Sequence, residues 1–542
     1  MSIPAHILML SAENDALPGG KVGGVGDVVR DVPTALVSLP EFEGCVTVVV
    51  PSAGFLHKDA TASLGTFSFP FGGQEHTGEL FEVPGKRPHP RIRQLVIHHP
   101  ILEAVDPNTG KPRIYVDDPA DRPFASDATR FACFSAAAAA ALKAGLFGDI
   151  DRVHLHDWHA GLFLFVRDFV PGFADLKQYR TAFTIHNLAL QGIRPLRDPD
   201  AEVSDGLNNA SNLEAWFPGV DYDLSIVTDP EYTDCVNPMA IGIRLSDAVH
   251  VVSPGYADEV CLPSRPHRNS PDCVFFGGEG LEADLQQARD DDRLHGILNG
   301  CEYVEGVSLP ERNEATWYEL LATVEAEVSN WYRKKQTPRH WLALQRLREL
   351  RHSGKRPTVV MTSVTRVVDQ KVRLMREPAG SAPLDRILAE TAGDAVYLLA
   401  GSGDTGYEDY LDEVARRHSN LIFLNGYSQS GADALYKFGD LFLMPSAFEP
   451  CGISQMLAMR DGQPCVVHWI GGLKDTVHDG ETGFAFSGDS PEGLAQGFIE
   501  TVNRAVAMKL NQPEEFARIQ RAAFASRMLW ADSVREYLQK LY

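Results

Sequence analysis

Short runs of apolar, largely β-branched residues alternate with stretches of helical period, and they constrain the fold of this chain more than any other feature. In the first half the runs are HILML, CVTVVVP, RVHLHDW, RTAFTIHN and DAVHVVSP, and in the second half they are TVVMTSV, AVYLLAG, NLIFLNG, DLFLMPS and PCVVHW. Strands that are buried on both faces of a parallel sheet carry continuous apolar runs of this kind. The pattern therefore predicts an α/β protein built on doubly wound, mainly parallel sheets.

The division of the runs into two sets predicts two domains. A chain of 542 residues is too long for one ordinary domain. We expect a first Rossmann-like domain over 1–305 and a second over 356–520, joined by a helical segment over 306–355 that belongs to the C-terminal half. Ligands of open α/β sheets bind beyond the carboxyl ends of the strands, so a cleft between the two domains is the expected site.

The composition narrows the classes of partner. The formal net charge of −23 opposes a general role in binding nucleic acid or anionic membranes. The opening residues show neither a positive segment nor a long apolar stretch, and the alanine-rich run at 134–147 is interrupted by Lys143. We therefore expect no signal peptide and a packed helix rather than a membrane span. The eight cysteines form no C-x-x-C pair, which favours reduced thiols in the cytoplasm and no zinc site.

A glycine-rich stretch, LPGGKVGGVGDVV, joins the first predicted strand to the helix that follows. Glycine lets backbone N–H groups approach a ligand closely, and a helix N-terminus favours anions. The stretch therefore predicts a phosphate site, to which Lys21 adds positive charge. It is not a Walker loop, because no Gly-Lys-Ser/Thr follows, and a plain strand-to-helix turn is the alternative.

A second glycine cluster contains Gly401, Gly403 and Gly406 in the dinucleotide-binding spacing, directly after a predicted strand. The next strand ends in Asn425 and offers no acid that could hold a ribose hydroxyl. A nicotinamide cofactor is therefore not expected. A nucleotide diphosphate and a simple turn both remain compatible with the cluster.

Histidines and an aspartate follow two predicted strands of the first domain, in HLHDWHAGL and FTIHNLALQG. His156, Asp157, His159 and His186 should therefore lie at one edge of the sheet. Histidine is the commonest transition-metal ligand, but the spacing matches no HExxH helix or compact triad, so we expect no metal and keep structural histidines as the alternative. Asp290 and Asp292 lie in a polar stretch that predicts a solvated helix end.

The second half places charged residues and glycines after several of its predicted strands. Arg366 and Lys371 could neutralise a diphosphate leaving group, with a solvated charged loop as the alternative. Glu449 precedes Cys451-Gly452 and an apolar-periodic helix, so its carboxylate and the N–H groups of a helix start point at one place. The next strand leads into Gly471-Gly472, and the two adjacent strand ends should converge on one ligand.

Together these motifs resemble those of the bacterial glycogen synthases and plant starch synthases, retaining glucosyltransferases with two facing Rossmann-like domains, the GT-B fold. KVGGVGDVV is similar to the family's Lys-x-Gly-Gly-Leu-Gly-Asp-Val, HLHDWHAGL to its His-x-His-Asp-Trp-His-Ala, and TIHNLALQG to its Thr-x-His-Asn-x-Ala-Tyr-Gln-Gly. ILNGCEY, TRVVDQK, PSAFEPCGISQ and GGLKDTV follow in the family's order. The resemblance covers nearly the whole chain, and it implies that 521–542 form a helix that returns to the first domain.

The resemblance also implies roles for single residues. Those implied to be catalytic are Glu449, His186, Asp157, Arg366 and Lys371. Those implied to bind the donor are Lys21, Gly23, Gly24, Asn299, Tyr427, Cys451, Gly452, Gly471, Gly472 and Leu473, with Tyr427 at the place where the family stacks an aromatic ring on the base.

The activity implied by the resemblance is transfer of glucose from ADP-glucose to the 4-hydroxyl at the end of an α-1,4-glucan or maltooligosaccharide, with retention and without a metal or another cofactor. The chain departs from the family pattern at Leu190, Ala240, Glu302 and Lys474. These departures leave the base and the acceptor open. The alternatives are an enzyme of the same fold that uses UDP-glucose or a non-glucan acceptor, and a glucan-binding protein that has lost catalysis.

Overall fold

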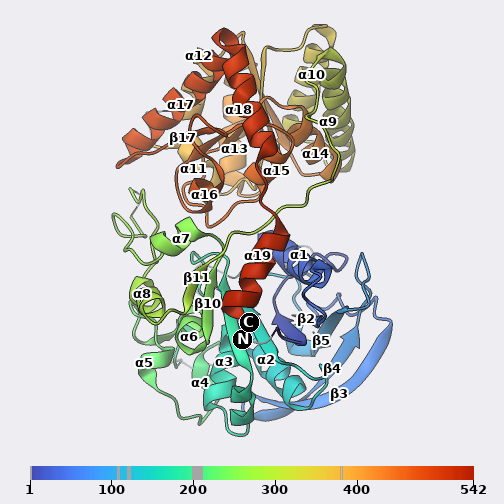
Figure 1. The fold of residues 1–542 in the computed structure, drawn as a ribbon, viewed down its shortest axis with the longest axis vertical. Coiled ribbons are helices and arrows are strands. Elements are labelled where there is room, and N and C mark those ends of the chain that lie inside the picture. The colour runs from blue at the N-terminus through green and yellow to red at the C-terminus, as the bar shows by residue number, and fades with distance from the viewer. Residues whose placement is uncertain are drawn as a thin grey trace. The chain divides into compact units, whose positions relative to one another are not determined.

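The structure is a computed structural model that describes residues 3–106, 110–116, 118, 124–197, 211–270, 272–378, 380 and 382–542. The chain forms two compact units, drawn as ribbons in Figure 1. Unit 1 comprises Met1–Pro263, Gly277–Gly300 and Trp530–Tyr542, and unit 2 comprises Ser264–Phe276 and Cys301–Leu529.

These boundaries differ from the expected ones at three places. The second stretch of unit 1 ends at Gly300 rather than at residue 305. The segment 264–276 belongs to unit 2, where the Phe276 ring lies 4.8 Å from that of Phe448 between centroids. The chain returns to unit 1 at Trp530 rather than at residue 521. The later return is explained by the helix Pro513–Ala525, which continues past residue 521 and buries Phe516, Ile519 and Ala523 in the cores of unit 2.

Unit 1 contains a nine-stranded sheet of order β11-β10-β7-β6-β1-β2-β5-β4-β3. Neighbouring strands are parallel from β11 to β5, as the continuous apolar runs predict. The strands are β1 (His6–Leu10), β2 (Cys45–Pro51), β3 (Ala62–Phe71), β4 (Gln74–Glu82), β5 (Ile92–His98), β6 (Arg152–His156), β7 (Arg180–Ile185), β10 (Ala248–Val251) and β11 (Leu294–Gly296).

Strands β3 and β4 form an antiparallel ribbon at one edge of this sheet, and β4 pairs with β5 in the same antiparallel sense. In both strands exposed and buried residues are mixed, because only one face of the ribbon meets the core. Continuous apolar runs are therefore absent from both strands, and the sequence pattern does not predict them. Residues 62–82 extend the sheet without adding to the parallel part that carries the predicted site residues.

The helices of unit 1 cover the sheet and bury their apolar faces against it. In α2 (Ala125–Lys143) nearly every residue before Lys143 is buried, which confirms that the alanine-rich run is a packed helix. The other helices are α1 (Gly24–Ser38), α3 (Trp158–Phe169), α4 (Leu213–Trp216), α5 (Leu224–Val227), α6 (Pro238–Leu245), α7 (Pro254–Glu259) and α8 (Glu282–Asp290). Two short strands, β8 (Arg194–Pro195) and β9 (Cys235–Val236), and 3₁₀ turns at Pro100–Leu102 and Ala174–Gln178 complete the unit.

Unit 2 contains a six-stranded parallel sheet of order β14-β13-β12-β15-β16-β17. Its strands are β12 (Val359–Val364), β13 (Ala395–Gly401), β14 (Leu421–Asn425), β15 (Leu441–Met444), β16 (Cys465–His468) and β17 (Phe484–Phe486). The first five coincide with predicted runs. The strand order changes direction at β12, so the carboxyl ends of β12 and β15 lie next to each other, at the position where ligands bind in such sheets.

Two helices from the segment between the strand sets, α9 (Glu314–Lys334) and α10 (Pro338–His352), pack side by side on this sheet (Figure 1). A capping box formed by Asn313 and Thr316 starts α9. The remaining helices of unit 2 are α11 (Asp369–Arg376), α12 (Pro383–Glu390), α13 (Thr405–Arg417), α14 (Gln429–Phe438), α15 (Ser454–Arg460), α16 (Gly472–Thr476), α17 (Pro491–Asn511) and α18 (Pro513–Ala525).

The returning segment consists of α19 (Trp530–Glu536) and a π-helical turn at Tyr537–Leu541. Trp530, Val534, Tyr537 and Leu541 are buried in a core of unit 1 that also contains residues of β1, β2 and α1. The segment is therefore part of the packed interior of unit 1.

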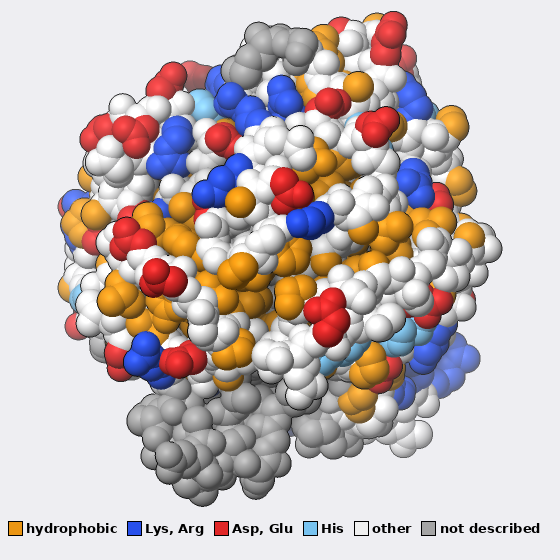
Figure 2. Space-filling view, turned by 90° about the horizontal axis from the view of Figure 1, so that it is seen from below, with side chains coloured by type: hydrophobic (Ala, Val, Ile, Leu, Met, Phe, Trp, Pro, Cys, Tyr) orange, Lys and Arg blue, Asp and Glu red, His pale blue; other side chains and the backbone are white. Residues whose placement is uncertain are grey.

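Among the described residues, no helix is both long and apolar enough to span a membrane. On the face drawn in Figure 2, acidic and basic side chains of the described residues are interspersed rather than gathered by sign. This face therefore offers no broad basic patch of the kind that binds nucleic acid.

Candidate functional site

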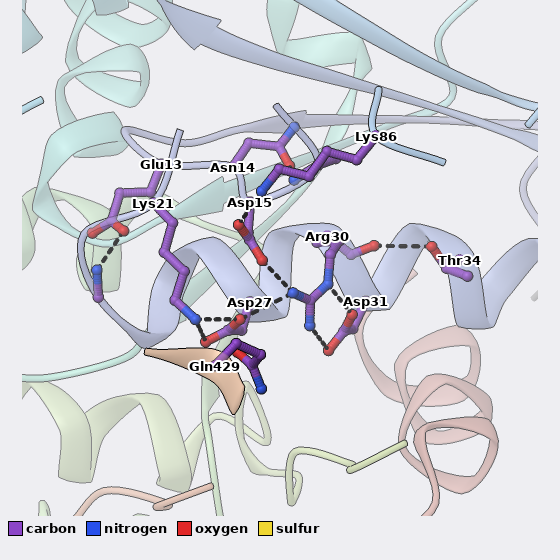
Figure 3. A network of polar contacts seen from close by, with 12 residues as sticks. Glu13, Asn14, Asp15, Lys21, Asp27, Arg30, Asp31, Thr34, Lys86 and Gln429 are labelled. Atoms are coloured by element: carbon purple, nitrogen blue, oxygen red, sulfur yellow. Dashed lines mark hydrogen bonds and ion pairs between the residues drawn. The ribbon is translucent and has the colours of Figure 1, made fainter. Parts of the chain in front are cut away.

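In unit 1, the glycine-rich stretch after β1 encloses a carboxylate from the same chain (Figure 3). The backbone N–H groups of Val22 and Gly23 each donate to Glu13 Oε2 at 2.6 Å, and the Tyr115 hydroxyl donates to Glu13 Oε1 at 2.8 Å. Glu13 is only 2% exposed. The amide of Gly23, which was expected to meet a phosphate, thus binds an internal anion, and Gly24 begins α1.

Lys21 lies on the solvent side of this stretch and pairs with Asp27 of α1, with Nζ and Oδ2 2.6 Å apart. Arg30 continues the network by pairing with Asp15 and by donating from Nε to Asp31 at 2.6 Å, as Figure 3 shows. Opposite charges alternate along this network, and the acidic neighbours raise the pKa of Arg30 against the opposing effect of burial. Asp27 thus holds the Lys21 ammonium in place. A ligand phosphate that bound Lys21 would have to compete with the Asp27 carboxylate for it.

Asp157 and His186, at the carboxyl ends of β6 and β7, lie together as predicted. The Asp157 carboxylate accepts the His186 backbone N–H at 2.7 Å. Burial raises the pKa of Asp157 to about 7, while the N–H groups of His186 and Asn187 oppose that rise. Asp157 has φ 57° and ψ −179°, a conformation that favours glycine, so the backbone carries strain at this position.

His156 connects Asp157 and His186 to the sheet. Its Nδ1 lies 3.0 Å from Nε2 of His186, and burial holds the pKa of both rings well below the ordinary histidine value. Both rings are therefore neutral, and one of the two nitrogens donates. The Nε2 of His156 is buried without a hydrogen-bond partner among the described residues. A buried N–H without an acceptor is rarer than an acceptor without a donor, so we infer that His156 Nδ1–H donates to His186.

Asn299 lies after β11, the next strand of the sheet beyond β10, and is 4% exposed. Its side-chain oxygen is buried without a hydrogen-bond partner in the described part of the chain. Such an acceptor is costly unless a ligand satisfies it. Asn299, which the resemblance assigns to donor binding, therefore has an open acceptor.

In unit 2, Lys371 and the buried Glu449 form a partly buried ion pair. Glu449 follows β15 and also accepts the Ser446 hydroxyl at 3.0 Å, while Lys371 lies in the first turn of α11, after β12. Arg366 precedes it on the same loop and is exposed. The adjacent ends of β12 and β15 thus bring together a carboxylate and a cation, and Arg366 adds a second cation to the same loop.

The loops at Glu449–Gly452 and Gly471–Leu473 are packed against each other by their backbones. The N–H of Gly472 donates to the Glu449 carbonyl at 3.0 Å. A Cβ atom on Gly472 would lie 2.5 Å from Cys451 Cα, so the contact requires glycine. Leu473 is buried in the core and anchors its loop. The loops after these two strands therefore lie together, and their convergence on one ligand stays a prediction.

The second glycine cluster has a structural role. A Cβ on Gly401 would clash with the Thr365 carbonyl, and one on Gly403 would clash with that of Val367. The two positions let the loop after β13 lie against the loop after β12, and Asp404 caps α13 through its side chain. The simple-turn alternative accounts for this cluster.

Tyr427 follows β14 and has 57% of its surface exposed, with its hydroxyl donating to Gln429 Oε1 at 2.9 Å. The ring borders a surface pocket of about 520 Å³ that is also lined by Glu327, Asn330, Trp331, Arg333, Lys334 and Ser428. An exposed aromatic ring beside an open pocket can stack on a flat ligand.

The motif at Asp290 is explained by the end of a helix. Asp290 ends α8 and accepts the Gln286 side-chain amide at 2.9 Å, as expected of a solvated helix end. Across the described residues, no group of three or more His, Cys, Asp or Glu side chains has a metal-binding arrangement.

The sequence analysis did not predict a role for Glu13. Like the histidines of the first domain, Glu13 follows a predicted strand, so the same signal could have identified it.

Residues 6–287 match the family described as the starch synthase catalytic domain, and residues 382–504 match glycosyl transferases group 1. The chain belongs to the starch and glycogen synthase family. It is 30% identical to the glycogen synthase of Vibrio cholerae serotype O1 over 546 residues, which cover 96% of this chain and 95% of that protein. It is also 30% identical to the glycogen synthase of Gloeobacter violaceus over 536 residues, which cover 98% of this chain and 97% of that protein.

The fold agrees with the family. The catalytic domain of starch synthase IV from Arabidopsis thaliana, solved with ADP and acarbose, matches with a TM-score of 0.71 at 23% identity over 100% of this chain and 99% of that chain. The chain therefore has the GT-B fold of two Rossmann-like units, as the sequence predicted.

Proposed function

We propose that the protein transfers glucose from ADP-glucose to the 4-hydroxyl at the non-reducing end of an α-1,4-glucan, with retention of configuration. Membership of the starch and glycogen synthase family supports this activity. The observation that carries it within the structure is the partly buried Lys371–Glu449 pair beside the packed loops at Glu449–Gly452 and Gly471–Leu473.

In this proposal unit 2 stabilises the leaving group. Lys371 and Arg366 neutralise the diphosphate, and the backbone N–H groups around Cys451–Gly452 and Gly471–Leu473 donate to the donor sugar nucleotide. When the bond between glucose C1 and the phosphate oxygen breaks, its electron pair goes to the diphosphate, so fixed cations lower the barrier. Removing one such donor typically costs about 3 kcal/mol. Glu449 faces the sugar and is oriented by Lys371 and Ser446.

Unit 1 contributes the groups that hold the transferred glucose. Asp157, His186 and the open acceptor of Asn299 are assigned to its hydroxyls, and Lys21 with the backbone of Gly23 and Gly24 to the diphosphate. The inferred Nδ1–H of His156 occupies His186 Nε2. His186 then keeps Nδ1–H as a donor, which suits it to bind a sugar oxygen rather than to accept a proton.

The acceptor proton has a defined destination. The acceptor 4-hydroxyl attacks C1 from the face that the diphosphate leaves, and its proton passes to the departing phosphate oxygen. This front-face course uses no second carboxylate, and the position eight residues after Glu449 is Leu457. No cofactor and no metal takes part in the proposed reaction.

The choice of ADP-glucose over UDP-glucose rests on the family and on the Arabidopsis structure, whose ligands are ADP and acarbose. Tyr427 is the residue proposed to stack on the base. The departures from the family pattern leave the acceptor and the base open. Of the residues that depart, Leu190 is 51% exposed, Ala240 is fully buried in α6, and Lys474 lies over the Trp469 ring. UDP-glucose is therefore the alternative donor in the test.

The protein is further proposed to work in the cytoplasm on an α-glucan or maltooligosaccharide. None of the eight cysteines forms a disulfide in the structure, which supports a reducing compartment.

The test measures nucleotide release by the purified protein with ADP-glucose or UDP-glucose, with and without glycogen, and repeats the active combination with EDTA. Glycogen-dependent release of ADP that EDTA leaves unchanged is expected. Glu449→Gln should lower kcat at least about 100-fold, whereas Glu390→Gln, on the exposed side of α12, should not. Release from UDP-glucose alone would overturn the donor assignment. Glycogen binding without any turnover would identify a glucan-binding protein instead.

A further inference from the structure

Four buried side chains form a hydrogen-bonded row across the sheet of unit 1. His250 Nε2 lies 3.2 Å from the Ile297 carbonyl, and its Nδ1 lies 2.9 Å from the Thr184 hydroxyl. The same hydroxyl lies 2.6 Å from His154 Nε2, whose Nδ1 lies 2.7 Å from the hydroxyl of Tyr542. The four side chains come from β10, β7, β6 and the returning segment, and each is at most 1% exposed.

Each proton in this row has one possible position. The Ile297 carbonyl can only accept, so His250 carries its proton on Nε2, and its Nδ1 accepts from Thr184, since burial keeps this ring neutral with a pKa of about 3. Thr184 has then used its single proton and must accept from His154 Nε2–H. His154, which burial also keeps neutral, is left with an unprotonated Nδ1, which only the Tyr542 hydroxyl can satisfy.

The row lies directly beneath the site residues. Thr184 is two residues before His186, His154 is three before Asp157, and Ile297 is two before Asn299. The His154 ring also stacks on that of His156, with centroids 4.3 Å apart and planes at 27°, and His156 bonds to His186. A change in the tautomer or tilt of His154 would therefore reach His186 through one stacked ring.

The returning segment supports the same site at a second point. The Ser533 hydroxyl donates to the Leu298 carbonyl at 2.6 Å, and a Cβ on Gly300 would lie 2.5 Å from Trp530 Cα. These contacts lie on both sides of Asn299. Tyr542 is itself fixed by Arg152, whose Nε donates to the Tyr542 backbone carbonyl at 2.8 Å.

From this geometry we propose that Tyr542 and Thr184 are positioning residues, which fix the tautomers of His154 and His250 and thereby the placement of His186 for the sugar. The inference rests on the proposed function for the identity of the reaction. The tautomers themselves do not depend on it. The returning segment then helps to position His186 in unit 1, although none of its residues is proposed to touch the substrate.

The experiment compares Tyr542→Phe and Thr184→Val with Thr47→Val. Thr47 is the matched control, because it is a fully buried threonine of β2, a strand of the same sheet that β1 separates from β6, and its hydroxyl bonds His6 Nε2 at 2.8 Å, outside the row. Nitrogen-15 NMR of histidine-labelled full-length protein reports which ring nitrogen carries the proton. Kinetics with the nucleotide sugar and glycogen report kcat and KM, and urea unfolding reports the stability lost in each variant.

In the wild type, His154 and His250 should both be neutral and protonated on Nε2. Tyr542→Phe and Thr184→Val should shift the His154 signals toward a mixture of tautomers and lower kcat about tenfold, with the KM for the donor changed less than twofold. Thr47→Val should lose comparable stability and keep both the tautomers and kcat. A His154 protonated on Nδ1 in the wild type would overturn the proposal, and so would an unchanged kcat in Tyr542→Phe. A wild type that shows the expected tautomers but no glucosyl transfer would contradict only the proposed function.

Discussion

Replacing His159 by phenylalanine should make unit 1 less sensitive to acid. His159 is the second residue of α3, and its ring lies among aromatic rings, with centroids 4.2 Å from Trp158, 4.6 Å from Phe131 and 5.4 Å from Tyr115. Its Nδ1 is buried without a hydrogen-bond partner in the described residues. Burial, with a smaller contribution from the nearby positive charge of Arg130, lowers the pKa of His159 from 6.5 to about 3.

The size of the effect follows from the difference in pKa between the two states. Below pH 6.5 the histidine binds a proton in the unfolded state but not in the folded state. The stability that neutral His159 contributes is therefore complete above pH 6.5 and is lost as the pH falls toward 3. Between pH 7.5 and pH 5 this one residue should lower the free energy of unfolding by about 2 kcal/mol. Phenylalanine has no proton to bind, so the His159→Phe variant should lose about 2 kcal/mol less than the wild type over the same interval.

The assay is hydrogen exchange of the α2 and α3 peptides across a urea series at pH 7.5 and pH 5, because it follows unit 1 separately from unit 2. The exposed His352 of α10 provides the control, and His352→Phe should leave the acid-induced loss unchanged. The reasoning would be refuted if His159→Phe and the wild type lost the same free energy between the two pH values. Overpacking by the larger ring would lower stability at both pH values equally and would not affect this difference.

Substitutions at three further positions test single features of the site. Glu13→Ala removes the anion that holds the Val22 and Gly23 amides and should raise the KM for the nucleotide sugar about tenfold, measured by initial rates at saturating glycogen; an unchanged KM would show that the carboxylate does not shape the loop. Asp157→Gly relieves the strained backbone whereas Asp157→Ala does not, so urea unfolding should find the glycine variant more stable by about 1–2 kcal/mol despite its greater flexibility. Gly472→Ala should destabilise unit 2 by about 1–3 kcal/mol in thermal unfolding, because the added methyl group meets the Cys451 backbone; a stability equal to that of the wild type would mean that the two loops do not pack as described.

The sequence was sufficient for the parallel strands other than β5, β11 and β17, because strands such as β6 and β13 are apolar on both faces and therefore recognisable without context. It was not sufficient for β3 and β4, whose residues alternate between core and solvent only in part. The segment 264–276 shows no change in composition that could assign it to unit 2, since its assignment depends on a contact between Phe276 and Phe448, which are far apart in the chain.

The candidate site was predictable where polar residues follow apolar runs, as with Asp157, His186 and Glu449. The partner of the Gly23 amide could not be predicted, because nothing in the local sequence shows that the Glu13 carboxylate accepts a hydrogen bond from it. The glycines at 401 and 403 were ambiguous for a similar reason. Their spacing suits a dinucleotide, and only the neighbouring Thr365 and Val367 carbonyls show that the space they leave is filled by another loop.

Unit 1 is assembled from three separate stretches of chain, so it is completed only late in biosynthesis. A ribosome delivers the residues of β1 first and those of Trp530–Tyr542 last, so the first unit to emerge can be completed only after the whole second unit has been made. Until then, the apolar surface of β1, β2 and α1 that later receives Val534 and Leu541 is uncovered. Nascent chains stalled before residue 530 should therefore be the species most prone to aggregate and most dependent on chaperones.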